Sequence, residues 1–244
     1  MLSVLIPLCL GFTALYGQSS ATPVSRILPE QRVVDKSFQW RSALDQSIRA
    51  LLLEHGFRFA VQPFTRKRLG GPFFRDYAES LKALGGWGDQ DPWIINYVAH
   101  PLQGAVTAYI QVQNDPAGRY VEFGATKEYW HSRLKALAWN TAYSTQFELG
   151  PISESSLGNV GQRKGTSGYV DLVMTPTGGF AWQIAEDWLD RRFIQRWEDR
   201  TTSVAKRTFY RIALNPGRAI ANILRGKGPW HRDGRALAPS KGSS

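Results

Sequence analysis

The chain has 244 residues, with 30 Lys and Arg against 20 Asp and Glu, and a single cysteine, Cys9. One cysteine excludes an internal disulfide, and Cys9 lies in the N-terminal apolar segment, so a chain cleaved after that segment has no thiol for catalysis or metal binding. The length suits one sizeable domain, which must then be held together by packing alone.

The first 21 residues are predicted to be a secretory signal peptide. Residues 2–17 contain no charged side chain, and this run is shorter than the ~20 apolar residues that a membrane-spanning helix needs. Ser19 and Ala21 have the spacing of a small-x-small cleavage site. No Lys or Arg precedes the apolar run, which leaves a retained anchor as the alternative. The sequence predicts export to the periplasm or the envelope membrane surface, with a linker at residues 22–36.

Helical periodicity dominates the rest of the chain, and residues 37–226 are predicted to form a single helical domain. A first helix is expected at 37–55, ended by Gly56, because glycine commonly stops a helix. Further helices are expected at residues 72–84, 92–112, 125–149, 169–200, 203–214 and 216–224. The predicted fold class is all-α, a bundle of about six to eight helices, some broken at Pro or Gly, with polar stripes facing inward. A disordered basic tail is expected at 227–244.

Residues 92–112 contain no Asp, Glu, Lys or Arg, yet their polar residues follow one helical face: Asn96, His100, Gln103, Thr107 and Gln111. Solvent-facing helix surfaces are normally rich in Lys and Glu. An uncharged stripe is therefore predicted to be buried, with a plain water-facing stripe as the alternative. Pro101 disfavours helical geometry at His100, so two half-helices are expected to meet there.

Two later segments carry comparable polar stripes. One contains Asn140, Ser144 and Glu148, and the other contains Asp171, Thr175, Gly179, Gln183, Glu186 and Asp190. In the second, Pro176 and the Gly178-Gly179 pair indicate either a break or a close helix contact. If the three stripes are buried together, they form a candidate polar cluster of His100, Glu148, Asp171 and Glu186. The predicted buried polar network around it consists of Asn96, Gln103, Ser144 and Thr175.

One imidazole with two or three carboxylates can bind a divalent ion or carry out acid–base chemistry. The spacing of a known metal motif is absent, because there is no His-x-x-x-His and the single Glu-x-x-His, Glu128 to His131, does not include His100. No metal and no cofactor is therefore predicted, and a purely structural His100 is the alternative.

Positive charge is concentrated towards the C-terminus. Residues 190–244 contain thirteen Lys and Arg against four Asp and Glu, and so carry +9 of the chain's net charge of +10. Such a region is typical of contact with nucleic acid or with an anionic membrane surface. Predicted export argues against nucleic acid, so membrane lipid head groups are the expected partner, with a merely solubilising surface as the alternative. Nine Trp and nine Tyr also favour a membrane interface.

Residues 93–104, WIINYVAHPLQG, resemble the Asn-Tyr-x-x-His-Pro-x-x-Gly signature of a bacterial envelope family, the domain-of-unknown-function 3943 family. Further matching positions follow in the same order: Ser144 and Glu148, residues 171–179 (DLVMTPTGG), Glu186 and Leu214-Asn215-Pro216. The resemblance covers residues 87–224. It implies envelope or membrane association and carries no activity.

These patterns predict an exported, membrane-associated and non-catalytic helical protein of the bacterial cell envelope. The alternative is an envelope hydrolase acting on a lipid or cell-wall substrate, with His100 as the base and Glu148, Asp171 or Glu186 as partners. A soluble helical binding protein is a third interpretation. A separation above about 10 Å between His100 and all three acids would exclude the hydrolase, because proton transfer needs hydrogen-bond or one-water reach.

Overall fold

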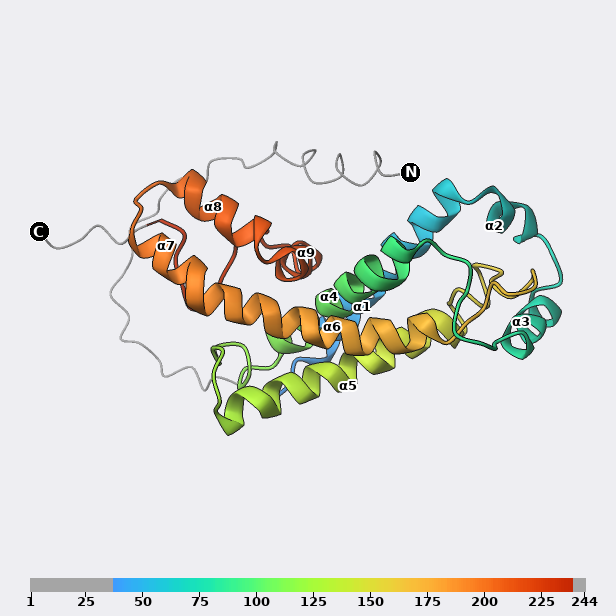
Figure 1. Ribbon diagram of the computed structural model, residues 1–244, viewed down its shortest axis with the longest axis horizontal. Coiled ribbons are helices and arrows are strands. Elements are labelled where there is room, and N and C mark those ends of the chain that lie inside the picture. Colours follow the sequence, from blue (N-terminus) through green and yellow to red (C-terminus); the bar gives the residue numbers. More distant parts are fainter. Residues whose placement is uncertain (1–36, 239–244) are drawn as a thin grey trace, which may run out of the picture. The chain divides into compact units, whose positions relative to one another are not determined.

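The computed structural model describes residues 37–238, which lie within one compact unit and contain no strand. The helical elements follow one another as α1 Trp40–Val61, α2 Pro63–Arg68, α3 Phe73–Lys82, η3 Ile95–Ala99, α4 His100–Asn114, α5 Lys127–Leu149, α6 Val170–Leu189, η4 Asp190–Ile194, α7 Gln195–Asp199, α8 Val204–Ala213 and α9 Pro216–Leu224 (Figure 1). The π-helical segment η3 continues directly into α4, and η4 joins α6 directly to α7, so the described residues form eight continuous helical segments. The predicted all-α class is confirmed. The predicted signal peptide and linker lie outside the described residues.

Helix α4 forms the centre of the bundle and packs against α1, α5, α6 and α9. Every residue from 104 to 114 is buried, which explains why this helix contains no charged side chain. Val106, Tyr109 and Ile110 join apolar side chains of α1, α5 and α9 in the main core. Within residues 37–238, no helix has both the length and the apolar character needed to cross a bilayer.

The chain around Pro101 stays helical. Residues 93–114 form one continuous helix that widens into a π turn at Ile95–Ala99, where the His100 N–H donates to the carbonyl of Ile95. Proline has no N–H and its ring would clash with the carbonyl four residues earlier, and the wider turn accommodates both features. The two half-helices expected at His100 are therefore replaced by a single helix with a local π turn. The stop expected at Gly56 is also wrong, because α1 continues to Val61.

Helices α4 and α6 approach most closely where Gly104 faces Gly179. A Cβ atom built on Gly104 would lie 1.9 Å from the carbonyl oxygen of Thr175, and one built on Gly179 would lie 2.5 Å from the Gly104 Cα. Helix α6 stays continuous through Pro176. Of the two alternatives for the Gly178-Gly179 pair, the close helix contact is confirmed. Gly104 comes one turn after His100 on α4. The close contact at Gly104 therefore fixes how near the polar residues of α4, such as His100, lie to those of α6, such as Asp171.

The C-terminal segment packs onto the helices. Asn222 of α9 donates hydrogen bonds of 3.0 Å to the carbonyls of Pro229 and His231, and Arg211 of α8 donates to the carbonyls of Trp230 and Ala236. These bonds satisfy peptide groups that would otherwise need water. The disordered tail expected from residue 227 is therefore wrong for 227–238, and 239–244 lie outside the described residues.

Candidate functional site

Three of the four residues predicted to cluster do meet in the structure. His100 of α4, Glu148 of α5 and Asp171 of α6 each offer one ligand atom, and these atoms all lie within 4.8 Å of one another. His100 Nε2 lies 3.4 Å from Asp171 Oδ1. The three residues are 7%, 8% and 5% exposed. His100 therefore lies well within about 10 Å of two of the predicted acids, so its position does not exclude acid–base chemistry. Sequence spacing predicted no metal site, but the folded chain places one nitrogen and two oxygen ligands side by side.

Glu186 lies elsewhere on α6, fifteen residues or ~22 Å of helix beyond Asp171. Its Oε1 accepts hydrogen bonds from Gly217 N (2.7 Å) and Trp182 Nε1 (2.8 Å), and its Oε2 accepts one from Arg218 N (3.1 Å). Glu186 therefore caps the first turn of α9, where free N–H groups and the helix dipole favour a carboxylate. The prediction that it belongs to the cluster is wrong.

Replacing Glu186 with alanine is expected to lower the free energy of unfolding by about 2 kcal/mol, because the first turn of α9 loses its buried acceptors. Urea unfolding followed by circular dichroism measures the change. Glu186→Gln keeps one oxygen acceptor and should lose less. Equal stability of the alanine variant and the native chain would show that α9 does not depend on this cap.

The imidazole of His100 is oriented by a relay of hydrogen bonds. Its Nδ1 lies 3.1 Å from Gln103 Oε1, and Gln103 Nε2 donates to Glu54 Oε2 at 3.1 Å. The Tyr143 hydroxyl donates to the same Glu54 oxygen at 2.7 Å. An amide oxygen only accepts, so Nδ1 carries the ring proton and Nε2 faces Asp171 with a free lone pair. Histidine ligands of metal ions are held in this way by partners on the other ring nitrogen.

Asp171 shares a hydrogen bond with Asp89, a residue of the loop before η3. Burial, followed by the hydrogen bond and the charge of Asp89, raises the pKa of Asp171 to about 9. Burial alone would raise the pKa of Asp89 too, but hydrogen bonds from Asp171, the Asp91 N–H and Asn96 outweigh it and lower that pKa. At neutral pH the pair therefore holds one proton, on Asp171, which faces an ionised Asp89.

Glu148 has an unsatisfied oxygen at the centre of the site. Its Oε1 makes no hydrogen bond to any described residue. Burial, followed by the charges of Glu154 and Asp171, raises the pKa of Glu148 well above its usual value. Arg58 is already paired with Glu154. A buried carboxyl oxygen without a partner is stabilised by a proton or a metal ion, and one oxygen of this carboxyl group lies within 4.8 Å of two further ligand atoms.

The predicted polar network is buried around these residues, with Gln103 partly exposed. Asn96 donates to Asp89 at 2.8 Å, and Gln103 belongs to the histidine relay. Ser144 and Thr175 lie one turn from Glu148 and Asp171, and their hydroxyl oxygens have no hydrogen-bond partner among the described residues. The network therefore contains unused donors and acceptors next to the three ligand groups.

Sequence reasoning missed Glu54, Arg58, Asp89 and Glu154. Asp89 follows the turn formed by Gly85-Gly86-Trp87-Gly88, which docks on the start of α6 through Tyr169 N to Gly86 O (3.1 Å) and Val170 N to Trp87 O (3.0 Å). The position of this acidic residue directly after a glycine-rich turn could have indicated that Asp89 belongs to the site. The other three lie in α1 and in the loop after α5, where periodicity gave no polar stripe.

Comparison with known proteins returned no match, either to a protein-family model, to a curated protein or to a solved structure. The likeness to the domain-of-unknown-function 3943 family therefore stays a prediction, carried by the residues around His100.

Proposed function

We propose that this chain is an exported envelope protein that binds a divalent metal ion at His100, Glu148 and Asp171 and hydrolyses a lipid or cell-wall substrate there. The observation that carries the proposal is the convergence of three ligand atoms from three helices within 4.8 Å. One imidazole and two carboxylates suit Zn²⁺ or Mn²⁺. Three protein ligands leave a coordination position free, at which such an ion lowers the pKa of a bound water.

The unpartnered Glu148 oxygen favours an ion over a purely structural cluster. In a tetrahedral site, ligand atoms about 2.1 Å from the ion lie about 3.4 Å apart, so atoms up to 4.8 Å apart would have to approach by up to about 1.4 Å, a movement that two side chains can share. The His100 relay leaves Nε2 free to ligate. Once Asp171 has given up its proton to ligate the ion, the neighbouring Asp89 would be the carboxylate available to accept a proton from a metal-bound water.

Exposed aromatic side chains favour a lipid over a cell-wall substrate. Trp87 and Trp93, 50% and 67% exposed, flank the loop that holds Asp89. Trp93 stacks on Tyr97 with ring centroids 5.6 Å apart, and the Tyr97 hydroxyl accepts a 3.0 Å hydrogen bond from Trp87 Nε1. Aromatic rings with one polar edge are favoured at the boundary between lipid and water.

Metal binding is tested on the full chain, stripped with a chelator and titrated with Zn²⁺ and with Mn²⁺ by calorimetry. One ion is expected per chain. Gln103→Ala should weaken binding by roughly 10–100-fold because it frees the His100 ring, and His100→Ala should weaken it further. The matched control is His131→Ala, since His131 is exposed on α5 and should leave the affinity unchanged. Equal affinities of the His100 and His131 variants would exclude the site.

Hydrolysis is tested separately by incubating the metal-loaded chain with phospholipid vesicles and with peptidoglycan, and identifying products by mass spectrometry. Products are expected from the lipid and should be lost in His100→Ala and Glu148→Gln. Metal binding without products from either substrate would retain the ion site and reject the hydrolase.

A further inference from the structure

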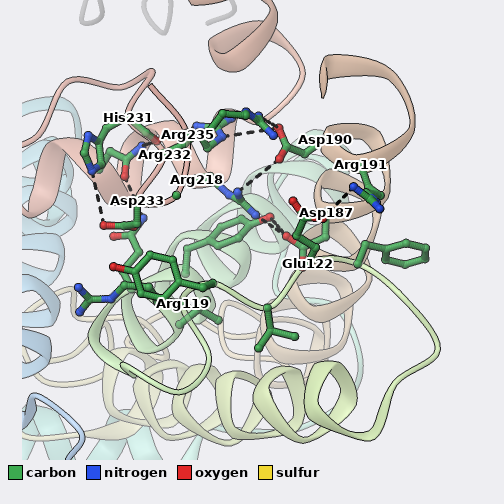
Figure 2. Close-up of a pocket in the computed structure, with 18 of the residues that line it drawn as sticks. Arg119, Glu122, Asp187, Asp190, Arg191, Arg218, His231, Arg232, Asp233 and Arg235 are labelled. Atoms are coloured by element: carbon green, nitrogen blue, oxygen red, sulfur yellow. Dashed lines mark hydrogen bonds and ion pairs between the residues drawn. The ribbon is translucent and has the colours of Figure 1, made fainter. Parts of the chain in front are cut away.

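A second polar cluster surrounds a cavity of about 230 Å³ at the far end of α6. Figure 2 shows Arg218 of α9 reaching both Asp187 and Asp190, and Arg235 of the C-terminal segment also reaching Asp190. Arg232 lies 3.6 Å from the same carboxylate. Asp171 of the histidine centre lies sixteen residues from Asp187, or ~24 Å along the helix. The two clusters are therefore separate sites.

Positive charge exceeds negative charge around this cavity. Its lining contains seven arginines against five Asp and Glu. The carboxylates are already shared: Asp187 lies 2.7 Å from Arg133 and 2.5 Å from Arg218, and Asp190 contacts Arg218, Arg232 and Arg235. Arg235 has a further partner outside the lining, Glu198 at 3.0 Å, but Glu198 also pairs with Arg211, so part of the arginine charge around the cavity has no counter-ion of its own.

Several guanidinium groups also have unused hydrogen-bond donors. The Nε atoms of Arg119, Arg218 and Arg232 make no hydrogen bond to any described residue, although all three residues line the cavity. Arg232 is 7% exposed, and its nearest acid, Asp190, lies 3.6 Å away and already accepts a 2.8 Å hydrogen bond from Arg235. A buried cation with a free donor beside a cavity is an energetic cost unless water or an anion occupies the cavity, and an anion also neutralises the charge.

We propose that this cavity binds a phosphate group, supplied either by free phosphate or by the head group of an anionic phospholipid. Planar guanidinium forks match phosphate oxygens and form charge-assisted hydrogen bonds with them. The cavity lies below the usual range of about 300–1,000 Å³ for drug-sized ligands, which suits a small anionic group. The inference does not depend on the metal centre, and it assigns a site to the lipid contact predicted from the basic C-terminal region.

Binding is measured on the full chain with two probes: inorganic phosphate by calorimetry, and vesicles of phosphatidylglycerol or phosphatidylcholine by co-sedimentation. Arg232→Gln and Arg119→Gln are each expected to weaken, at least fivefold, the binding of whichever probe the native chain binds. Arg119→Gln is the safer variant, because this side chain lies partly exposed and donates to Gln39 alone among described side chains. Arg49→Gln is the matched control, since it removes the same charge from an exposed position outside the cavity.

The outcomes separate the two sources. Capture by phosphatidylglycerol vesicles that free phosphate displaces assigns a lipid head group, and phosphate binding without vesicle capture assigns the free anion. His100→Ala should bind both probes as the native chain does, which distinguishes this site from the metal centre. Absence of binding to both probes, or an equal loss in Arg49→Gln and Arg119→Gln, overturns the proposal and leaves a structural network of ion pairs.

Discussion

Replacing Gly104 with alanine is expected to lower the free energy of unfolding by about 3 kcal/mol or more. The new Cβ would lie 1.9 Å from the Thr175 carbonyl oxygen and 2.9 Å from the Gly179 Cα. Both neighbours are backbone atoms of α6, so no side-chain rotation can relieve the clash, and the helices must separate. Because His100 precedes Gly104 by one turn, the separation should also move His100 away from Asp171 and weaken metal binding.

Urea unfolding measures the loss, and Gly56→Ala provides the control. Gly56 lies inside α1, and a Cβ added there would have no atom within 4 Å, so alanine should be neutral or stabilise the helix by up to about 1 kcal/mol. If Gly104→Ala costs no more than Gly56→Ala, the close contact of α4 with α6 is not a determinant of the fold.

Replacing Asp187 with alanine is expected to cost about 3–5 kcal/mol, because it removes the shared counter-ion of two arginines. Asp187 accepts hydrogen bonds from the hydroxyls of Tyr109 (3.0 Å) and Tyr129 (3.1 Å), from Arg133 Nε (2.7 Å) and from Arg218 Nη2 (2.5 Å). The Arg133 and Asp187 side chains are each 2% exposed, so the substitution leaves the buried Arg133 guanidinium without its counter-ion. The variant should unfold at a clearly lower urea concentration.

Glu122→Ala is the comparison for this variant, since Glu122 forms an ion pair with Arg191 in which both side chains are at least half exposed. Exposed pairs contribute about 0–1 kcal/mol, so little change is expected. Similar losses in the two variants would mean that the burial of Asp187 adds nothing to its ion pairs.

Most of the helices and three of the site residues were predictable because they follow from local periodicity, whereas α2 at Pro63–Arg68 was not expected. The absence of charge in 92–112 correctly indicated a buried helix, and the stripes placed His100, Glu148 and Asp171 on inward faces. Glu186 shares the face of Asp171, but periodicity gives the direction of a side chain and not its depth along the bundle. Two residues on one face can therefore belong to sites ~22 Å apart.

The polar surroundings of the site depend on tertiary packing and could not be read from the sequence. Glu54 and Asp89 reach the centre from α1 and from a loop, and their positions depend on how distant segments dock. The basic C-terminal region shows the same limit. The amino-acid composition gives the number of arginines in this region, but it does not show that Arg211 is buried 2.5 Å from Glu198. Paired charges of this kind hold residues 227–238 against the helices.

The π turn before His100 makes the geometry of the proposed metal site depend on the number of residues in this turn. Such a turn accommodates one residue more than an α-helical turn. Inserting a further residue between 96 and 99, beyond the one that the π turn absorbs, would rotate the preceding segment by about 100° relative to His100. Asn96 would then turn away from Asp89, and the loop carrying that carboxylate would lose its anchor. Side-chain changes on the outer face of this turn should therefore be tolerated far better than the insertion of a further residue.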